Sequence, residues 1–433
     1  MRLSERISNG SARIAVIGQG YVGLPLAVEF ANAGFSVTGI DLDENKVATL
    51  NRGESYISDV ESQTIRRQLE ESRYHATSDM DVLAESDAIV ICVPTPLRKT
   101  KDPDISFVYS SASEVKSRLR PGQLIVLEST TYPGTTQELL LPMFEDQGYK
   151  VGQDFYLAFS PERIDPGNQQ FKVRDIPKVV GGITPDCSRM AALLYRQIVT
   201  RVTEVSNPTV AELAKLYENT FRSVNIALAN EFAMMCRYLD VNVWEVIEAA
   251  ATKPFGFMPF SPGPGIGGHC IPIDPIYLSW KLRLSGYEAR FIALADEVNR
   301  SMPRYVIELL TDAMNSRGKC LKGARILILG VAYKRGVSDM RESPALDVIT
   351  ELQRKGADLC YSDPFVPSLT HEGFDTPCVA LTPEVLRAAD AALILTDHNE
   401  FDYATILQHA ELVVDARNAT RGLIAPENKL VRL

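Results

Sequence analysis

The sequence lacks the cysteine and histidine spacings that build metal sites and disulfide frameworks. Its seven cysteines are scattered and odd in number, with no C-x-x-C pair, and its five histidines are dispersed, with no H-x-x-x-H pair. This pattern argues against a structural zinc site or a disulfide-stapled fold, and we expect no metal. Reduced thiols fit a reducing compartment best, so we expect a cytoplasmic protein.

Long apolar runs and net positive charge are also missing. No apolar run approaches the ~18 residues that cross a membrane, and no apolar stretch precedes the first predicted strand as in a secretory signal. The formal net charge of −10 argues against a general binder of nucleic acid or anionic membranes. A local basic pocket for a phosphorylated ligand remains compatible with that charge. At 433 residues the chain is too long for one ordinary core, so we expect two or three domains.

Short β-branched runs alternate with helical patterns in the first half of the chain. This alternation predicts a parallel sheet with helices on both faces. The runs are RIAVIG (13–18), SVTGID (36–41), AIVICV (88–93), QLIVLE (123–128) and YLAFS (156–160).

A long helical segment interrupts this rhythm, and the alternation resumes near residue 325. Residues 208–239 run from Pro208 without a further proline or any glycine, which predicts one long helix. We therefore predict an α/β protein with two Rossmann-like, doubly wound domains joined by a long central helix and a helical domain. The expected boundaries are 1–206 for a dinucleotide domain, 207–320 for the helical middle and 321–433 for the second α/β domain.

A glycine-rich turn follows the first predicted strand. Gly18, Gly20 and Gly23 form G-x-G-x-x-G between that strand and a helix, and Asp41 ends the next strand. Such glycines permit a tight turn, close approach of a pyrophosphate and close helix packing, while the acid binds ribose hydroxyls and repels a 2′-phosphate. The pattern predicts an NAD site. FAD, or glycines that serve only the tight turn, are the alternatives.

The segment SPGPGIGGHCIPIDP (261–275) surrounds Cys270 with glycines and prolines. A lone cysteine is usually an inert buried residue. Gly267 and Gly268 remove side chains beside this thiol, which suits a ligand that approaches the main chain closely. The residues alone leave a catalytic and a structural Cys270 equally open. His269 is interpreted as a residue that shapes the loop.

The long helix carries a polar stripe, because Lys215, Asn219 and Arg222 recur at helical spacing. Such a stripe is usually the solvated side of a helix. If it faces a ligand, Lys215 and Asn219 can donate to a developing oxyanion. Asn225 is a poor helix former that something in the fold would have to retain.

Three further segments follow predicted strands, where ligands bind in doubly wound folds. Each of them taken singly is also compatible with a simple turn. They are VPTP (93–96), ESTTYPGTT (128–136) and SPER (160–163).

These segments, in this order, resemble the nucleotide-sugar 6-dehydrogenases, the UDP-glucose and GDP-mannose dehydrogenase family. The resemblance covers nearly the whole chain and includes YKRGVSDMRESPA (333–345). The resemblance implies a four-electron oxidation of a sugar C6 alcohol to a carboxylate with two NAD. An aldehyde would be captured by Cys270 as a thiohemiacetal, oxidised to a thioester and hydrolysed.

The resemblance also implies roles for residues at matching positions. Cys270 would be the nucleophile, Lys215 and Asn219 would stabilise oxyanions, Asp274 would assist proton transfer or water activation, and Thr130 and Glu162 would contact the reacting water or alcohol. The implied NAD-binding residues are Gly18, Gly20, Tyr21, Val22, Gly23, Asp41, Pro94, Thr95, Thr130 and Arg341. The implied substrate-binding residues are Glu162, Arg163, Lys215, Asn219, Arg222, Phe260, Gly267 and Lys334. An inter-domain active site and a homodimer, or a larger homo-oligomer, built on the helical middle are implied as well.

Two departures from the family pattern bear on the substrate. The sequence SPERIDPGN lacks the second glutamate of UDP-glucose dehydrogenases, and Ile273 replaces their lysine. Both favour a UDP-N-acetylhexosamine, and TKPFGFMPF with the Cys270 loop is most similar to the branch that oxidises UDP-N-acetylglucosamine. UDP-glucose and the UDP-linked N-acetylgalactosamine and N-acetylmannosamine are alternatives. So are a one-step NAD alcohol dehydrogenase with a structural Cys270 and a non-catalytic NAD or nucleotide-sugar sensor.

Overall fold

A computed structural model describes residues 2–57, 59–98, 100, 102–164, 171–426 and 428–433. The predicted segment SPERIDPGN therefore lies partly outside the described residues, from Asp165 to Asn168. The chain forms two compact units. Unit 1 comprises residues 1–218 and 276–287, and unit 2 comprises residues 219–275 and 288–433.

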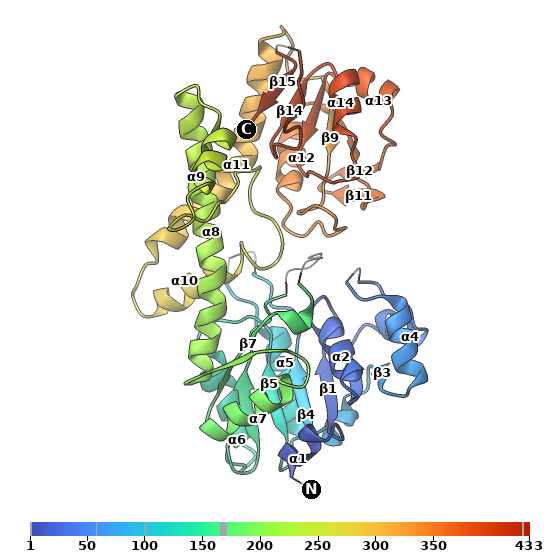
Figure 1. Ribbon diagram of the computed structural model, residues 1–433, viewed down its shortest axis with the longest axis vertical. Coiled ribbons are helices and arrows are strands. Elements are labelled where there is room, and N and C mark those ends of the chain that lie inside the picture. The colour runs from blue at the N-terminus through green and yellow to red at the C-terminus, as the bar shows by residue number, and fades with distance from the viewer. Residues whose placement is uncertain (1, 58, 99, 101, 165–170, 427) are drawn as a thin grey trace. The chain divides into compact units, whose positions relative to one another are not determined.

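Unit 1 is built on an eight-stranded sheet whose strands run side by side in the order β3-β2-β1-β4-β5-β6-β7-β8 (Figure 1). All neighbours pair in parallel except β6 and β7, which are antiparallel. The strands are β1 (Arg13–Ile17), β2 (Ser36–Ile40), β3 (Tyr74–Thr77), β4 (Ala88–Ile91), β5 (Leu124–Leu127), β6 (Tyr156–Phe159), β7 (Lys178–Gly182) and β8 (Val202–Val205).

Helices cover both faces of this sheet because alternate residues of each buried strand point to opposite sides. Ile14 and Val16 of β1 pack in one core with residues of α1, α2, α4 and α7, whereas Ala15 and Ile17 pack in a second core with α5 and α6. The helices are α1 (Leu3–Ser8), α2 (Gly23–Asn32), α3 (Glu44–Asn51), α4 (Ser62–Glu70), α5 (Ser106–Ser117), α6 (Leu141–Glu145) and α7 (Pro185–Tyr195). Unit 1 also contains two short 3₁₀ helices, η1 (Met80–Ala84) and η3 (Val173–Asp175), and a short π-helix, η2 (Thr135–Leu140).

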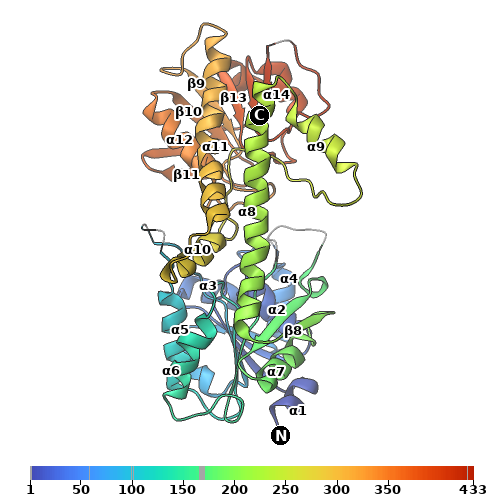
Figure 2. The same ribbon diagram turned by 90° about the vertical axis from the view of Figure 1, so that its left-hand side faces the viewer.

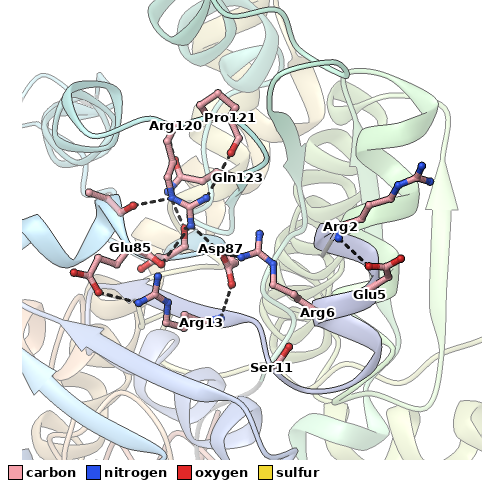
Figure 3. Close-up of polar contacts among 12 residues, drawn as sticks. Arg2, Glu5, Arg6, Ser11, Arg13, Glu85, Asp87, Arg120, Pro121 and Gln123 are labelled. Atoms are coloured by element: carbon pink, nitrogen blue, oxygen red, sulfur yellow. Dashed lines mark hydrogen bonds and ion pairs between the residues drawn. The ribbon is translucent and has the colours of Figure 1, made fainter.

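The amino-terminal edge of this sheet is held by one buried carboxylate, Asp87 (Figure 3). Arg6 Nη1 and Arg120 Nη2 each lie 2.8 Å from Asp87 Oδ1, and the backbone N–H of Arg13 donates to Oδ2 at 3.0 Å. These bonds tie α1, β1, β4 and the turn before β5 together. The cluster is therefore structural, and it lies at the opposite end of the strands from the predicted ligand sites.

Unit 2 contains a five-stranded parallel sheet in the order β10-β9-β13-β14-β15 and a two-stranded antiparallel pair, β11 and β12. The strands are β9 (Arg325–Leu329), β10 (Asp358–Ser362), β11 (Ser368–His371), β12 (Phe374–Pro377), β13 (Ala391–Ile394), β14 (Val413–Asp415) and β15 (Leu430–Arg432).

The helices of unit 2 again divide between two faces. Ile326 and Ile328 of β9 pack with residues of α9, α11 and α12, whereas Leu327 and Leu329 pack with α13 and α14. The helices are α9 (Val243–Ala251), α11 (Arg290–Asn315), α12 (Pro344–Arg354), α13 (Pro383–Ala388) and α14 (Tyr403–His409), while α8 (Pro208–Tyr238) and α10 (Asp274–Leu284) cross the unit boundary.

The predicted α/β class with two doubly wound sheets is confirmed, and the long central helix is α8, an unbroken element in Figure 2. β3, β7 and β8 extend the first sheet beyond the predicted strands, and α11 accommodates Pro303 inside the helix. The division into three domains stays a prediction. In the described ranges, no helix is both long enough and apolar enough to cross a membrane.

Candidate active site

The glycine-rich turn after β1 has two glycines that the fold requires and one that it does not. Gly18 has φ +91°, and a Cβ there would lie 2.5 Å from the carbonyl oxygen of Cys92. A Cβ at Gly23 would collide with the carbonyl oxygen of Gly18. A Cβ at Gly20 would lie in open space. Because packing does not explain Gly20, its missing side chain fits a bound pyrophosphate above the turn. Tyr21 and Val22, before α2, are half-buried.

Asp41 lies directly after β2 and is held beside this turn. Its Oδ2 accepts the backbone N–H of Gln19 at 2.9 Å, its Oδ1 accepts that of Asp43 at 3.0 Å, and Lys46 Nζ lies 3.5 Å from Oδ2. Gln19 is fully buried and its Oε1 accepts the Tyr74 hydroxyl at 2.9 Å. The sequence reasoning missed Gln19, although a large amide inside G-x-G was a visible signal. These bonds set Asp41 where an acid can bind a ribose.

The loops after β4 and β5 are joined to each other. Ser129 Oγ donates to the carbonyl of Val93 at 2.8 Å, and the Tyr277 hydroxyl of α10 donates to the carbonyl of Thr95 at 3.0 Å. Thr95 is buried, whereas Pro94 is exposed and Thr130 is half-buried. The predicted cofactor residues after these two strands therefore share the carboxyl edge of the first sheet.

The second half of ESTTYPGTT is held by a glutamate that the sequence reasoning missed. Glu212 of α8 accepts the backbone N–H groups of Gly134 at 2.5 Å and Thr136 at 3.0 Å, and the Thr136 hydroxyl at 2.7 Å. Burial raises the pKa of Glu212, against these hydrogen bonds. This segment is therefore more than a simple turn, because buried contacts fix it to α8.

Glu162 lies in a buried ionic cluster after β6. Lys178 Nζ lies 3.1 Å from Glu162 Oε2 and 2.9 Å from Glu128 Oε1, and Glu162 Oε1 accepts the backbone N–H of Arg163 at 2.6 Å. Burial raises the pKa of Glu162, but Lys178, the backbone and the charge of Lys215 outweigh it, so the pKa lies below its ordinary value. Lys215 and Glu162, predicted from separate motifs, therefore interact electrostatically within unit 1.

Arg163 is engaged within unit 1. Its Nη2 lies 2.7 Å from Glu218 Oε1, and its Nη1 donates to the carbonyl of Pro177 at 2.7 Å. The proposed contact of Arg163 with substrate would thus involve a guanidinium that also braces α8. Of the predicted helical stripe, Lys215 and Asn219 are buried while Arg222 is exposed, so the first two are not on the solvated side. Asn225 donates to the carbonyl of Phe221 within α8.

Cys270 is exposed in the loop that precedes α10. Its carbonyl accepts the backbone N–H of Ile273 at 3.1 Å and of Asp274 at 2.9 Å, which begins the helix. Burial, together with the charge of Arg341, lowers the pKa of His269.

The glycines before Cys270 leave room for the chain itself. A Cβ at Gly267 would lie 2.7 Å from Tyr333 Cβ and 2.8 Å from the carbonyl oxygen of Glu342, and one at Gly268 would lie 2.8 Å from Tyr333 Cε2. The backbone N–H of Gly268 also donates to the carbonyl of Arg341 at 3.1 Å. These glycines therefore pack the Cys270 loop against residues 333–344, and the predicted approach of a ligand to the same main chain stays a prediction.

Asn219 and Asp274 meet in unit 2. Asn219 Nδ2 donates to Asp274 Oδ2 at 2.5 Å, and both side chains are buried. Since Asp274 begins α10 four residues after Cys270, this bond ties the predicted proton-transfer group to the predicted oxyanion donor. Two residues predicted from different segments are thus brought together.

A buried amide pair anchors the start of the Cys270 loop, and the sequence reasoning missed it. Asn230 Oδ1 accepts the backbone N–H of Gly263 at 2.9 Å, Asn230 Nδ2 donates to Asn299 Oδ1 at 2.9 Å, and Asn299 donates to the carbonyl of Ser223 at 3.1 Å. These bonds hold the loop to α8 and α11. Phe260, just before the loop, stacks edge-on against Phe221 at 5.7 Å between ring centroids.

The segment after β9 presents basic side chains. Lys334 is half-buried, and Arg341 is exposed and paired with Asp339 at 2.7 Å. Arg417, which follows β14, donates through Nε to the carbonyl of Leu395 at 3.0 Å. Burial and nearby Arg335 lower the pKa of Arg417 to about 10, against Asp415. The sequence reasoning did not select Arg417, whose crowded cation lies at the carboxyl edge of the second sheet.

A glycine turn with an acid after the next strand is typical of a dinucleotide-binding domain, and a basic carboxyl edge on a second sheet suits a phosphorylated ligand. The chain belongs to the UDP-glucose/GDP-mannose dehydrogenase family: the NAD binding domain matches residues 12–199, the central domain residues 209–301 and the UDP binding domain residues 327–422. It is an NAD-dependent UDP-sugar dehydrogenase.

Its relatives carry two different substrate names. The chain is 36% identical over 393 residues to a UDP-N-acetyl-D-glucosamine 6-dehydrogenase of Pseudomonas aeruginosa, covering 90% of this chain and 91% of that protein. It is 36% identical over 415 residues to a UDP-N-acetyl-D-mannosamine dehydrogenase of Pyrococcus horikoshii, covering 94% and 95%. A solved UDP-D-ManNAc dehydrogenase from P. horikoshii matches with a TM-score of 0.89 at 33% identity, covering 97% of this chain and 98% of that one.

Across the part of the chain that the structure describes, no group of three or more His, Cys, Asp or Glu side chains could hold a metal ion.

Proposed function

We propose that the protein oxidises the C6 alcohol of a UDP-N-acetylhexosamine to the uronic acid, with UDP-N-acetylglucosamine as the first substrate to test. Exposed Cys270, in a loop fixed through Gly263 and Gly268, is the observation that carries this proposal. NAD held by the turn of Gly18, Gly20 and Gly23 beside Asp41 would supply the hydride acceptor for each of the two oxidations.

Each proposed site residue has its own role in these two oxidations. The alcohol first loses a hydride and a proton to give an aldehyde, and the thiol of Cys270 adds to that carbonyl to form a thiohemiacetal. Loss of a second hydride and proton leaves a thioester, and water cleaves it to the acid and the free thiol. Lys215 and the second N–H of Asn219 donate to the oxyanions, while Asp274 takes the proton of the attacking water. Thr130 and Glu162 orient the alcohol and water.

The N-acetylated sugar is supported by the residues around Cys270 and by the relatives. Ile273, which replaces a lysine of the UDP-glucose enzymes, is buried. The relatives are named for UDP-N-acetylglucosamine and UDP-N-acetylmannosamine. These two substrates differ only in configuration at C2, so both belong in the same assay.

The test counts the NADH formed per molecule of limiting UDP-N-acetylglucosamine, UDP-N-acetylmannosamine, UDP-N-acetylgalactosamine or UDP-glucose. Two NADH per sugar, with Cys270→Ser unable to release acid, is the expected result. Cys320→Ser is the matched control, because Cys320 is also exposed but lies outside the site segments. One NADH per sugar, or an unaffected Cys270→Ser, would establish a one-step alcohol dehydrogenase instead. Binding without turnover of any sugar would indicate a sensor.

We further propose that a second copy of the chain covers an apolar stripe of α8. Val210, Tyr217, Phe221, Leu228 and Met235 recur at helical spacing and are each at least 40% exposed. A stripe of this kind on a long helix marks an interaction surface. Leu228→Lys should convert a dimer to monomers in light scattering, and an unchanged mass would refute the assignment. The inter-domain active site and the cytoplasmic location stay predictions.

A further inference from the structure

Four neighbouring strands of the first sheet bring ionisable side chains to its carboxyl edge. Cys92 follows β4, Glu128 follows β5 and Glu162 follows β6, while Lys178 opens β7. β7 runs antiparallel to β6, so its first residue lies at the edge where the others end. All four side chains are buried, and charges this deep in a fold must be paired or neutralised.

Lys178 is the centre of this cluster. Its ammonium group lies 2.9 Å from Glu128 Oε1, 3.1 Å from Glu162 Oε2 and 3.5 Å from the carbonyl of Pro161. An ammonium group has three donors, so these partners use its capacity. The two carboxylates keep Lys178 charged, because they raise its pKa against the effect of burial.

The two carboxylates differ in their remaining partners. Glu162 also accepts the backbone N–H groups of Arg163 and Ile164, and the positive charge of Lys215 lowers its pKa. Glu128 Oε1 accepts Lys178 and the hydroxyl of Tyr195, while Glu128 Oε2 is buried and has no hydrogen-bond partner among the residues described. The donors around Glu162 favour its ionised form, whereas the unpaired buried oxygen of Glu128 favours the protonated form of Glu128.

The partners of Glu128 decide which of its oxygens can carry a proton. With Glu128 Oε1 already occupied by the donors of Lys178 and Tyr195, Oε2 is the atom that can hold it. Burial raises the pKa of Glu128 to about 7, against Lys178 and together with Glu162.

We propose that Lys178 is a positioning residue for the dehydrogenase reaction, which holds Glu162 as an oriented carboxylate while Glu128 carries the proton of the cluster. Glu162 can then accept a hydrogen bond from the sugar alcohol or the reacting water, and a protonated Glu128 adds no second negative charge beside it. The inference rests on the function proposed for Glu162. The charged and titratable groups that face this cluster are Cys92 of the β4 end, Glu128, Glu162, Lys178, Tyr195 of α7 and Lys215 of α8.

The pH dependence of kcat/KM tests the assignment. Lys178→Met should lower kcat at pH 7 at least about tenfold. It should also shift the acid limb, the low-pH fall of kcat/KM, to a pH about one unit or more higher, because Glu162 then takes up a proton more readily. Lys178→Arg should restore most of the wild-type profile. Glu128→Gln, which mimics the protonated acid, should leave the acid limb at its wild-type pH. A wild-type limb in a folded Lys178→Met enzyme would overturn the proposal.

Two further measurements separate this role from simple stability. If Lys178→Met does not fold, Glu128→Gln/Lys178→Met replaces it, since it removes one acid and one cation together, and a wild-type limb in that enzyme would equally overturn the proposal. Infrared spectra should show the C=O band of a protonated buried carboxyl at pH 6, which is lost in Glu128→Gln. Persistence of that band in Glu128→Gln would overturn the assignment of the proton.

The matched control lies at the other end of the same strands. Asp87→Asn breaks a buried carboxylate with cationic partners and should lower thermal stability without moving the acid limb. Glu162→Gln separates the proposed role of Glu162 from the proposed role of Lys178. If that variant is as active as the wild type, the proposed role of Glu162 fails. If it is inactive while Lys178→Met keeps the wild-type limb, only the role of Lys178 fails.

Discussion

The first turns of the two sheets have the same construction. Gly18 and Gly330 follow the central strands β1 and β9, with φ +91° and +81°. Each backbone N–H donates to the end of the neighbouring strand, at 2.7 Å to Ile40 and 2.9 Å to Ser362. A Cβ at Gly18 would lie 2.5 Å from the carbonyl oxygen of Cys92, just after β4. A Cβ at Gly330 would lie 2.5 Å from Thr396, just after β13. The tight turn is thus a property of the fold and not of a particular ligand.

The acids beside these turns differ. Asp41 has 13% of its side chain exposed and accepts two backbone N–H groups. Asp363 is fully buried and accepts Val331 and Ala332 at 2.8 and 3.1 Å, Phe365 at 2.8 Å and His398 at 3.1 Å. A carboxylate has about four acceptor sites. The fold therefore saturates Asp363, whereas Asp41 retains capacity for a ribose.

The segments that follow the turns differ as well. α2 begins at Gly23, inside the glycine motif, while α12 begins only at Pro344. The longer second segment carries Lys334 and Arg341. One turn thus offers backbone donors at a helix start, and the other offers cations. The same strand-turn arrangement therefore differs between the two sheets in one acid and in the length of the segment before the next helix.

Alanine at the two turn glycines should have the largest effect. Gly18→Ala and Gly330→Ala each impose a left-handed conformation that costs about 1–2 kcal/mol, with a backbone clash in addition. Gly18→Ala should abolish NADH binding in fluorescence titrations. Gly330→Ala should lower the melting temperature and weaken UDP binding while it retains NADH binding. The reverse pattern would contradict the assignment of the two units.

The second largest effect is expected from asparagine at Asp363, whose acceptor sites the fold occupies. Asp363→Asn should cost about 1–3 kcal/mol in the free energy of unfolding, because buried donors lose their acceptor. Burial raises the pKa of Asp363, but the bonds from His398 and the backbone outweigh it, so the folded pKa is depressed. Its stabilisation is present above the unfolded pKa of about 4 and is lost as pH falls through the folded pKa. Denaturant titrations between pH 7 and 3 should show this dependence reduced in the variant. An equal loss in Asp41→Asn would remove the distinction between the acids.

Alanine at Gly20 separates cofactor binding from folding. Since its Cβ would meet no packed atom, stability should change by less than about 0.5 kcal/mol. The Kd for NADH should nevertheless rise about tenfold, because the methyl group blocks the approach of a pyrophosphate. Calorimetry and NADH titration on the same sample check both values. Unchanged affinity would show that the glycines serve only the turn.

The smallest expected effect is on cofactor choice. Asp41→Asn removes the charge that repels a 2′-phosphate and should raise the NADP-to-NAD ratio of kcat/KM several-fold, about 1 kcal/mol. Asp43→Asn is the control, because Asp43 is the neighbouring acid that caps α3 and asparagine caps equally well. A similar gain in the control would trace the effect to general charge.

The elements that sequence reasoning located are those whose signal is local. Hydrophobic runs located the strands β1, β2, β4, β5 and β6, and a first-turn proline with helical spacing located α8. Asp41 was located because it follows a strand end at a recognisable distance from the glycines. Missed residues have distant partners instead. Lys178 meets Glu128 across 50 residues, Asn230 meets Asn299 across 69 and Glu212 meets Thr136 across 76.

The sequence by itself therefore determined the fold class, the NAD-binding turn, the long helix and the loop that carries Cys270, since each is written in neighbouring residues. Only the tertiary structure decided that Gly20 is free of packing, that Gly267 and Gly268 seat against Tyr333, and that Glu162 shares Lys178 with Glu128. The physical reason is burial. The state of a buried polar group depends on which partners the sheet order brings within hydrogen-bond distance, and strand order is not encoded in any local pattern.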